Sequence, residues 1–223
     1  MLLAAYMLAA SGLVVGAAPD DAIGWLHKNG AAEPYIPHEG DVLFYDDLNK
    51  LWTFLFWLGG TKPPFHVGIV VKRPDGSPAV LEAGADDQTW VWVLDLAPRM
   101  RDFEGVLQVR RCKVALTPEQ SQRLTAFAMA QDGKRYAVVR LALQLTPFRS
   151  RGWLHQRFYA TTYLDRQRWV CVEIVVAAGT LVGLFDPAVV KATAAYPLDL
   201  LDDRVFNLSP VYEEARYWSP RPQ

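Results

Sequence analysis

The sequence predicts one domain of the α+β class, because extended apolar runs fill its first half and helical patterns follow. The chain has 223 residues, which is enough for one domain with a sizeable core and short for two. Two apolar runs around a Pro-Asp-Gly turn, at 65–84, are typical of a β-hairpin. The apolar spacing at 117–133 and 169–184 is helical instead. Composition and periodicity alone reach no further than this class.

The composition excludes several classes of function. A net charge of −1 gives no electrostatic reason to expect nucleic acid as a partner. No phosphate-binding loop or dinucleotide fingerprint occurs, and the four histidines lack the short spacing usual for zinc. We therefore expect no metal and no cofactor. Cys112 and Cys171 are too few for a disulfide framework, although a single bridge between them stays open for an exported protein.

Residues 1–18 carry no charged side chain and are mostly Leu, Ala and Val. We interpret them as a signal peptide or a membrane anchor, with a misassigned start or a buried helix as alternatives. The first two interpretations predict an exported protein, whether periplasmic, extracellular or anchored to a membrane through 1–18. Residues 19–38 are polar and turn-rich, and we interpret them as a linker with one short helix at 22–28.

The elements after the linker are predicted from their apolar patterns and their ends. A Thr at 117, a Pro at 118 and a Gln at 120 predict a capped helix start, and Gly133 ends that helix. The tail from Lys191 is expected to wrap the surface. Besides the hairpin, strands are expected at 42–45, 90–94 and 106–109, and helices at 48–58, 117–133, 136–145 and 169–184.

His66 and Glu82 stand out in the hairpin at 65–84, which is otherwise apolar. A buried hairpin has little reason to hold both residues unless they meet, so we interpret them as two-thirds of a catalytic triad. Gly68, the next residue on the same face as His66, leaves space beside the imidazole. The alternative is a surface histidine and a solvated glutamate.

The length of the turn tests this interpretation. Side chains alternate between the two faces of a strand, so a two-residue turn at 75–76 would put Glu82 on the wrong face. A five-residue loop at 73–77 pairs Lys72 with Pro78 and places Glu82 diagonal to His66, within reach of its side chain. We therefore predict an odd-length loop or a bulge.

A cysteine hydrolase also needs a thiolate beside the histidine. Cys171 stands at the apparent start of a helix, where backbone N–H groups lower the pKa of a thiol and can stabilise an oxyanion. Cys112 follows a strand, between Arg111 and Lys113, and has no obvious histidine. Cys171 is therefore the candidate nucleophile, with a buried inert cysteine as the alternative.

Four motifs, in this order, resemble the circularly permuted papain-like family, the YiiX-like relatives of the NlpC-type cysteine peptidases. They are Gly40-Asp41-Val42-Leu43-Phe44, Phe65-His66-Val67-Gly68-Ile69-Val70, Leu81-Glu82-Ala83 and Trp169-Val170-Cys171-Val172-Glu173. The resemblance implies a hydrolase domain at 39–218, with a small antiparallel barrel-like sheet packed against the cysteine helix. It makes Cys171 the nucleophile, His66 the base and Glu82 the residue that orients the base. Val172 departs from the small polar residue that the family usually has there.

The resemblance implies a thiol-dependent amidase or peptidase that cleaves an amide through an acyl-enzyme. Cell-wall peptides and lipid-linked amides are the implied substrates. A lipid acyltransferase or esterase on the same triad, or an inert binding module, are the alternatives. Tyr136 is a candidate pocket residue or a core aromatic, and Glu173 either meets a cationic substrate group or forms a structural salt bridge. The aromatic stretch at 51–57 contacts lipid or is simply a core helix.

Overall fold

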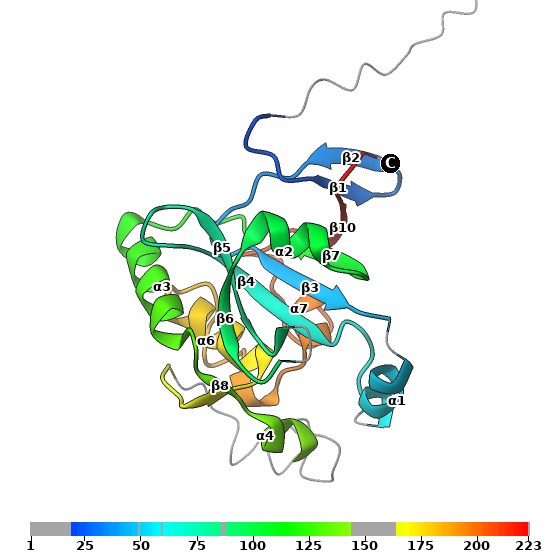
Figure 1. Cartoon of the computed structure of the whole chain (residues 1–223), viewed down its shortest axis with the longest axis vertical. Helices are drawn as coiled ribbons and strands as arrows, with labels where there is room; N and C mark the ends of the chain where they lie inside the picture. Colours follow the sequence, from blue (N-terminus) through cyan, green and yellow to red (C-terminus); the bar gives the residue numbers. More distant parts are fainter. Residues whose placement is uncertain (1–18, 49, 59, 86–87, 144–163, 223) are drawn as a thin grey trace, which may run out of the picture.

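The computed structural model describes residues 19–222, apart from 49, 59, 86–87 and 144–163. Its main element is an eight-stranded sheet in which all neighbouring strands are antiparallel (Figure 1), which confirms the predicted α+β class. The strand order is β2-β1-β10-β7-β3-β4-β5-β6, so β2 and β6 are the outer strands, and Val91 on the outer side of β6 bonds to Gly133 and Lys134. The strands are β1 Trp25–Lys28, β2 Ala31–Pro34, β3 Val42–Asp46, β4 His66–Lys72, β5 Pro78–Ala83, β6 Val91–Asp95, β7 Val106–Arg110 and β10 Arg216–Ser219.

Helices cover both faces of this sheet. The helices α6 (Cys171–Leu181) and α3 (Pro118–Gln131) pack on one face, and α2 (Leu96–Asp102) packs on the other. Side chains of β3 alternate accordingly, so that Phe44 joins the core under α6 and Tyr45 joins the core under α2. The other elements are α1 Lys50–Leu58, α4 Val138–Leu143, the 3-10 turn η2 Ala192–Ala194, α7 Pro197–Leu201, and the parallel pair of β8 Arg135–Tyr136 and β9 Arg168–Trp169.

Several predicted elements are confirmed with their physical causes. The helix α3 begins with the expected capping box, in which the Gln120 N–H donates to the Thr117 hydroxyl and the Thr117 N–H donates to the Gln120 side chain. The strands predicted at 42–45, 90–94 and 106–109 correspond to β3, β6 and β7 within one residue. The helix predicted at 48–58 corresponds to α1.

The interpretation of 19–38 as a linker with a short helix is wrong for the described structure. Residues 25–34 form the hairpin β1–β2, which belongs to the main sheet. Asn29 and Gly30 make its two-residue turn, with φ of 53° and 85°, between the paired residues Lys28 and Ala31. An Asn-Gly turn is a strong hairpin signal, because both residues tolerate positive φ. The helix prediction for 22–28 missed this signal.

Two predicted helices begin later than expected. Tyr136 and Trp169 pair with each other in β8 and β9, so the following helices start at Val138 and Cys171. Pairing of the two short strands satisfies backbone groups that a helix would otherwise use. Residues 144–145 of the predicted helix at 136–145 lie outside the described residues.

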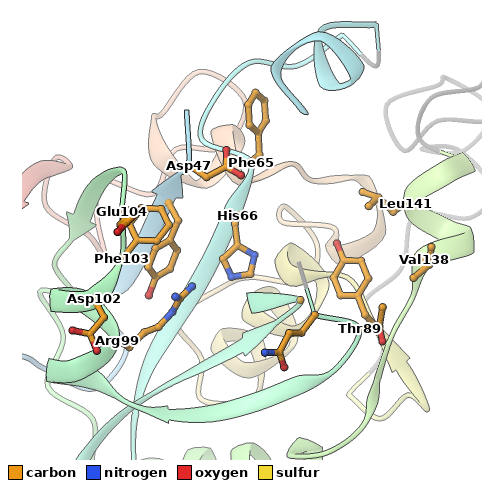
Figure 2. A pocket seen from close by; sticks show the side chains of 14 residues that line it. Asp47, Phe65, His66, Thr89, Arg99, Asp102, Phe103, Glu104, Val138 and Leu141 are labelled. Atoms are coloured by element: carbon orange, nitrogen blue, oxygen red, sulfur yellow. The ribbon is translucent and has the colours of Figure 1, made fainter. Parts of the chain in front are cut away.

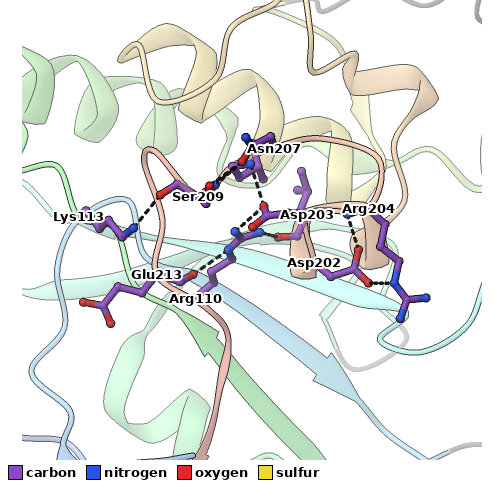
Figure 3. A network of polar contacts seen from close by, with 10 residues as sticks. Arg110, Lys113, Asp202, Asp203, Arg204, Asn207, Ser209 and Glu213 are labelled. Atoms are coloured by element: carbon purple, nitrogen blue, oxygen red, sulfur yellow. Dashed lines mark hydrogen bonds and ion pairs between the residues drawn. The ribbon is translucent and has the colours of Figure 1, made fainter.

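The tail from Lys191 does more than wrap the surface, because it ends in β10 inside the sheet. A polar network around the buried Arg110 of β7 holds the tail in place (Figure 3). The Arg110 guanidinium donates to the carbonyls of Glu213 (2.9 Å) and Leu200 (3.1 Å) and to the Asp203 carboxylate (2.7 Å). Each nitrogen of the Arg110 guanidinium therefore has a hydrogen-bond partner within the fold.

No helix in the described part of the chain is long and apolar enough to cross a membrane. Residues 1–18 lie outside that part, so the signal or anchor predicted there stays a prediction.

Candidate active site

The β4–β5 hairpin has the register that the sequence predicted. Lys72 pairs with Pro78 across a five-residue loop, in which the Arg73 N–H donates to the Ser77 carbonyl at 2.9 Å. Gly68 pairs with Glu82, so Glu82 lies diagonal to His66 on the same face. The predicted odd-length loop is therefore confirmed.

His66 and Glu82 meet on the face of the sheet that α2 covers. The distance from His66 Nε2 to Glu82 Oε2 is 3.0 Å, which is a hydrogen bond and, when the ring is protonated, an ion pair. The Glu82 side chain is completely buried, whereas the His66 side chain is 19% exposed. Gly68 makes this contact possible, because a Cβ there would lie 2.8 Å from Glu82 Cγ. The space beside the imidazole is thus used by the glutamate.

The electrostatics favour the charged forms of both residues. Burial lowers the pKa of His66, but hydrogen bonds with Cys171 and Glu82 and the charge on Glu82 outweigh it and raise this pKa to about 9. Burial raises the pKa of Glu82, but the hydrogen bond with His66 and the cations His66 and Arg99 outweigh it and lower this pKa to about 2. The imidazolium–carboxylate pair is therefore the stable state near neutral pH.

Cys171 is the first residue of α6, as the sequence predicted, and its thiol faces the start of β4. The β8–β9 pairing fixes this position, because Trp169 pairs with Tyr136 and its carbonyl accepts from the Ala137 N–H at 2.8 Å. The Cys171 thiol lies 3.9 Å from the Phe65 carbonyl and forms a hydrogen bond with His66. Its backbone N–H stands at the helix N-terminus, where four N–H groups lack partners within the helix.

Tyr136 lies beside this thiol. Burial, Cys171 and Glu173 raise the pKa of Tyr136 well above its usual range, so its hydroxyl stays protonated. The ring packs on Gly84, where a Cβ would lie 2.7 Å from Tyr136 Cε2. Tyr136 also lines the cavity described next.

A cavity of about 840 Å³ opens beside His66. Figure 2 shows His66 at its centre, with α2 and the residues after it on one side and α4 on the other. The α2 side contributes Arg99 and the carboxylates of Asp102 and Glu104, and the α4 side contributes the apolar Val138 and Leu141. Cys171 is 4% exposed and is not among the residues that line the cavity. The cavity therefore has a charged side and an apolar side.

Glu173 has a set of contacts that differs from the predicted substrate contact. It is 4% exposed, and its carboxylate accepts from Arg140 at 2.7 Å, from Arg166 at 3.4 Å and from the Val170 N–H at 3.1 Å. These contacts correspond to the alternative of a structural salt bridge, which ties α4 to the cysteine helix. Glu173 is not among the residues that line the cavity.

Cys112 lies in a different environment, away from any histidine pair of this kind. Its N–H donates to Asp41 at 2.7 Å and its thiol donates to the Val114 carbonyl at 3.3 Å. Burial raises the pKa of the Cys112 thiol to about 11. Both cysteines are free thiols in this structure. Within the described residues, no group of three or more His, Cys, Asp or Glu side chains is arranged to hold a metal ion.

Arg99 and Tyr45 belong to the site but were not predicted from the sequence. Arg99 donates from Nε and Nη2 to the Glu82 carboxylate, and its guanidinium lies 4.9 Å from the centre of the Tyr45 ring. The Tyr45 ring lies 5.3 Å from the His66 ring. The available signals were an arginine between the apolar Leu96 and Met100, and a tyrosine in a buried strand.

The fold and site together define an α+β protein in which a cysteine and a glutamate contact a histidine that lines a cavity. No family model and no curated protein matches the chain. Among solved structures, the chain is similar to the crystal structure of YiiX from Escherichia coli O157:H7, which is described as a metalloprotein. The identity is 22%, the alignment covers 66% of this chain and 67% of that one, and the TM-score is 0.45. A likeness at this level assigns no activity, which must be argued from the site.

Proposed function

We propose that the protein is a cysteine hydrolase of the permuted papain-like type, an amidase or peptidase that forms an acyl-enzyme on Cys171. One observation carries the proposal. A thiol at a helix N-terminus forms a hydrogen bond with a histidine whose Nε2 is bound by a buried carboxylate. Nucleophile, base and orienting group in this order are the arrangement that thiol hydrolysis requires.

The reaction follows from these positions. Glu82 accepts from His66 Nε2, which leaves Nδ1 to hold the proton that the Cys171 thiol gives up, so the reactive form is a thiolate beside the imidazolium. The thiolate attacks the amide carbonyl carbon, and the imidazolium then gives its proton to the departing amine as the C–N bond breaks. Water attacks the resulting thioester while His66 takes a proton from it, which releases the acid and the free thiol.

The negative charge of the tetrahedral intermediate also has donors available. The N–H of Cys171 is one candidate, because the first N–H groups of a helix have no carbonyl partner within it, and it already bonds the Tyr136 hydroxyl beside the thiol. The Tyr136 hydroxyl, which stays protonated, is the second donor beside the thiol. Loss of one such donor typically lowers kcat by about 10²–10³-fold.

The two sides of the cavity suggest how a substrate lies. The apolar Val138 and Leu141 suit an acyl or apolar peptide group, and the side of Asp102 and Glu104 suits a polar leaving amine. The volume of about 840 Å³ is in the range of small-molecule sites. An apolar acyl amide or a short peptide is therefore the substrate class that we propose.

The proposal is tested with p-nitroanilides that carry acetyl, fatty acyl or peptidyl groups. We expect release of nitroaniline, with a transient acyl adduct on Cys171 in the intact mass spectrum. Cys171→Ala should abolish both signals, and the matched variant Cys112→Ala should keep both. Turnover that persists in Cys171→Ala, or an adduct on Cys112, would contradict the proposal.

An observation on α1 favours a second candidate, acyl transfer or ester hydrolysis on a lipid. Leu51, Phe54 and Trp57 are 64%, 54% and 62% exposed, and Phe65 beyond the helix lines the cavity. Exposed apolar side chains of this size mark contact surfaces for apolar partners. A fatty acyl ester with an added amine acceptor distinguishes the candidates. Transfer to the acceptor in preference to water identifies an acyltransferase, whereas release of the free acid identifies a hydrolase.

A further inference from the structure

The site contains a fourth charged residue that the triad does not account for. Arg99 of α2 is 7% exposed in its side chain and forms a salt bridge with Glu82, with 3.1 Å between Nη2 and Oε2. Its Nε lies 3.3 Å from Oε1 and 3.2 Å from Oε2 of the same carboxylate. The guanidinium therefore contacts both oxygens of the residue that orients the base.

The aromatic rings around Arg99 fix this position. Its guanidinium lies 4.9 Å from the centre of the Tyr45 ring and 5.6 Å from that of Phe103. The same Tyr45 ring lies 5.3 Å from the His66 ring, so it forms a wall shared by the arginine and the histidine. Stacking on aromatic faces suits a guanidinium, which is planar and weakly hydrated. Leu96 and Met100 are buried and anchor α2 beneath this arrangement.

The reaction cycle creates the need for such a cation. Glu82 is completely buried, and a buried carboxylate without a counter-charge is costly. His66 supplies a positive charge only while it holds the extra proton, and it must give that proton up in each half of the reaction. A guanidinium does not titrate in the physiological range, so its charge stays when that of His66 is lost.

We infer that Arg99 is a positioning residue that keeps Glu82 ionised and correctly oriented while His66 changes its charge. Arg99 divides the charge of Glu82 between two cations, so His66 can release its proton without leaving an isolated buried carboxylate. The inference rests on the proposed function for its meaning in catalysis, but the coupling between Arg99, Glu82 and His66 can be measured without turnover. The other titratable groups around this trio are Tyr45 of β3, Cys171 of α6, Tyr136 of β8, and Asp47, Asp102 and Glu104 of the cavity wall.

The first experiment is an NMR titration of the His66 ring in the wild type and in Arg99→Met, with His66→Ala to assign the signal. Loss of the arginine leaves the whole charge of Glu82 to His66, so the midpoint of the titration should move up by about 1 pH unit or more. Arg101→Met is the matched control, because Arg101 is an exposed arginine on the same helix. It should leave the midpoint unchanged.

The second variant is Arg99→Lys, which keeps a positive charge but loses the planar contact with both oxygens. It should restore most of the wild-type midpoint. Arg99→Gln, which removes the charge but keeps a polar side chain, serves in place of Arg99→Met if that variant does not fold. With an amide substrate, Arg99→Met should lower kcat by about 10–10²-fold with little change in KM, because the base is misplaced rather than the substrate.

The outcomes separate the two proposals. A lowered Tm with an unshifted His66 midpoint in both Arg99 variants would make Arg99 purely structural and overturn the inference. A shifted midpoint in a protein that hydrolyses no amide would support the coupling while contradicting the proposed function. A shifted midpoint with a reduced kcat would support both.

Discussion

The two cysteines of this chain are almost equally buried, yet their surroundings give them opposite chemistry. Cys112 is 8% exposed and Cys171 is 4% exposed. The Cys112 thiol donates to a backbone carbonyl, and burial and the charge of Asp41 outweigh its backbone contact with Val114 and disfavour its thiolate. The Cys171 thiol forms a hydrogen bond with a histidine that is held positive by a buried glutamate. Burial alone therefore does not distinguish an inert cysteine from a nucleophile, whereas the charge of the neighbour does.

The largest effect is expected on removing His66, the charged neighbour of Cys171. At pH 6, His66→Ala should slow alkylation of Cys171 by iodoacetamide by about 10²-fold or more, because the thiol loses both the base and the imidazolium charge. The rate at Cys112 should not change. Peptide mapping of the alkylated protein measures both sites in one sample. His38→Ala is the control, and equal slow labelling of the two cysteines in the wild type would remove the contrast.

A dependence on pH is the next expected effect. The pKa of His66 in the folded protein is about 9, above its ordinary value of 6.5. Its stabilising pair with Glu82 is therefore fully present below pH 6.5 and is lost as the pH rises through about 9. We expect kcat/KM for an amide to fall over the same interval, because the leaving amine needs the imidazolium proton. Glu82, with its pKa lowered to about 2, contributes stability above pH 4.5 that is lost only as the pH falls through about 2.

Cys112 should follow a separate profile in that experiment. Its thiol has a pKa of about 11, so its alkylation should still be rising above pH 9, where hydrolysis is falling. Parallel pH profiles for hydrolysis and for Cys112 labelling would mean that the two sites are not electrostatically independent.

The smallest expected effect comes from Gly68→Ala, which adds one methyl group against Glu82. The new Cβ would lie 2.8 Å from Glu82 Cγ and 2.7 Å from Val80 Cγ2, so Glu82 must shift away from His66. We expect kcat to fall by about 10-fold, since a displacement of about 1 Å weakens a positioned base. Overpacking of this kind costs about 1–3 kcal/mol of unfolding free energy, which urea titration measures.

Gly133→Ala offers a contrast for this prediction, because no atom lies within 4 Å of its added Cβ. Gly133 has a φ of 76°, so the substitution strains the backbone and lowers stability away from the site. It should leave kcat unchanged. A similar loss of kcat in both variants would mean that Gly68→Ala acts through stability rather than through Glu82.

The hairpin of the site could be predicted from the sequence because its register depends only on local rules. Strand alternation and the length of the loop at 73–77 decide on which face Glu82 lies, and both can be counted along the chain. Cys171 could be placed at a helix start for the same reason. The contact between the Cys171 thiol and the His66 imidazole joins residues 105 positions apart, which local rules do not connect. It was therefore expected only from the family resemblance.

Other parts of the site depend on contacts that no local pattern reveals. Arg99 reaches Glu82 only because α2 folds back over β5 and β6, and the sequence of α2 does not state where that helix packs. The sequence left Glu173 between a substrate contact and a structural salt bridge, and only the structure shows that its partners are Arg140 and Arg166. The strand β1 was missed although its Asn-Gly turn was visible, since its partner β10 lies at the opposite end of the sequence.

The position of β10 between β1 and β7 also has a consequence for synthesis of the chain. Among the described strands, the N-terminal hairpin joins the backbone ladder only through β10, which leaves the ribosome last. A nascent chain can therefore pair β3 to β7 before β10, the strand that pairs with β1, has been synthesised. The hairpin β1–β2 therefore completes its place in the sheet after every other described strand has been made.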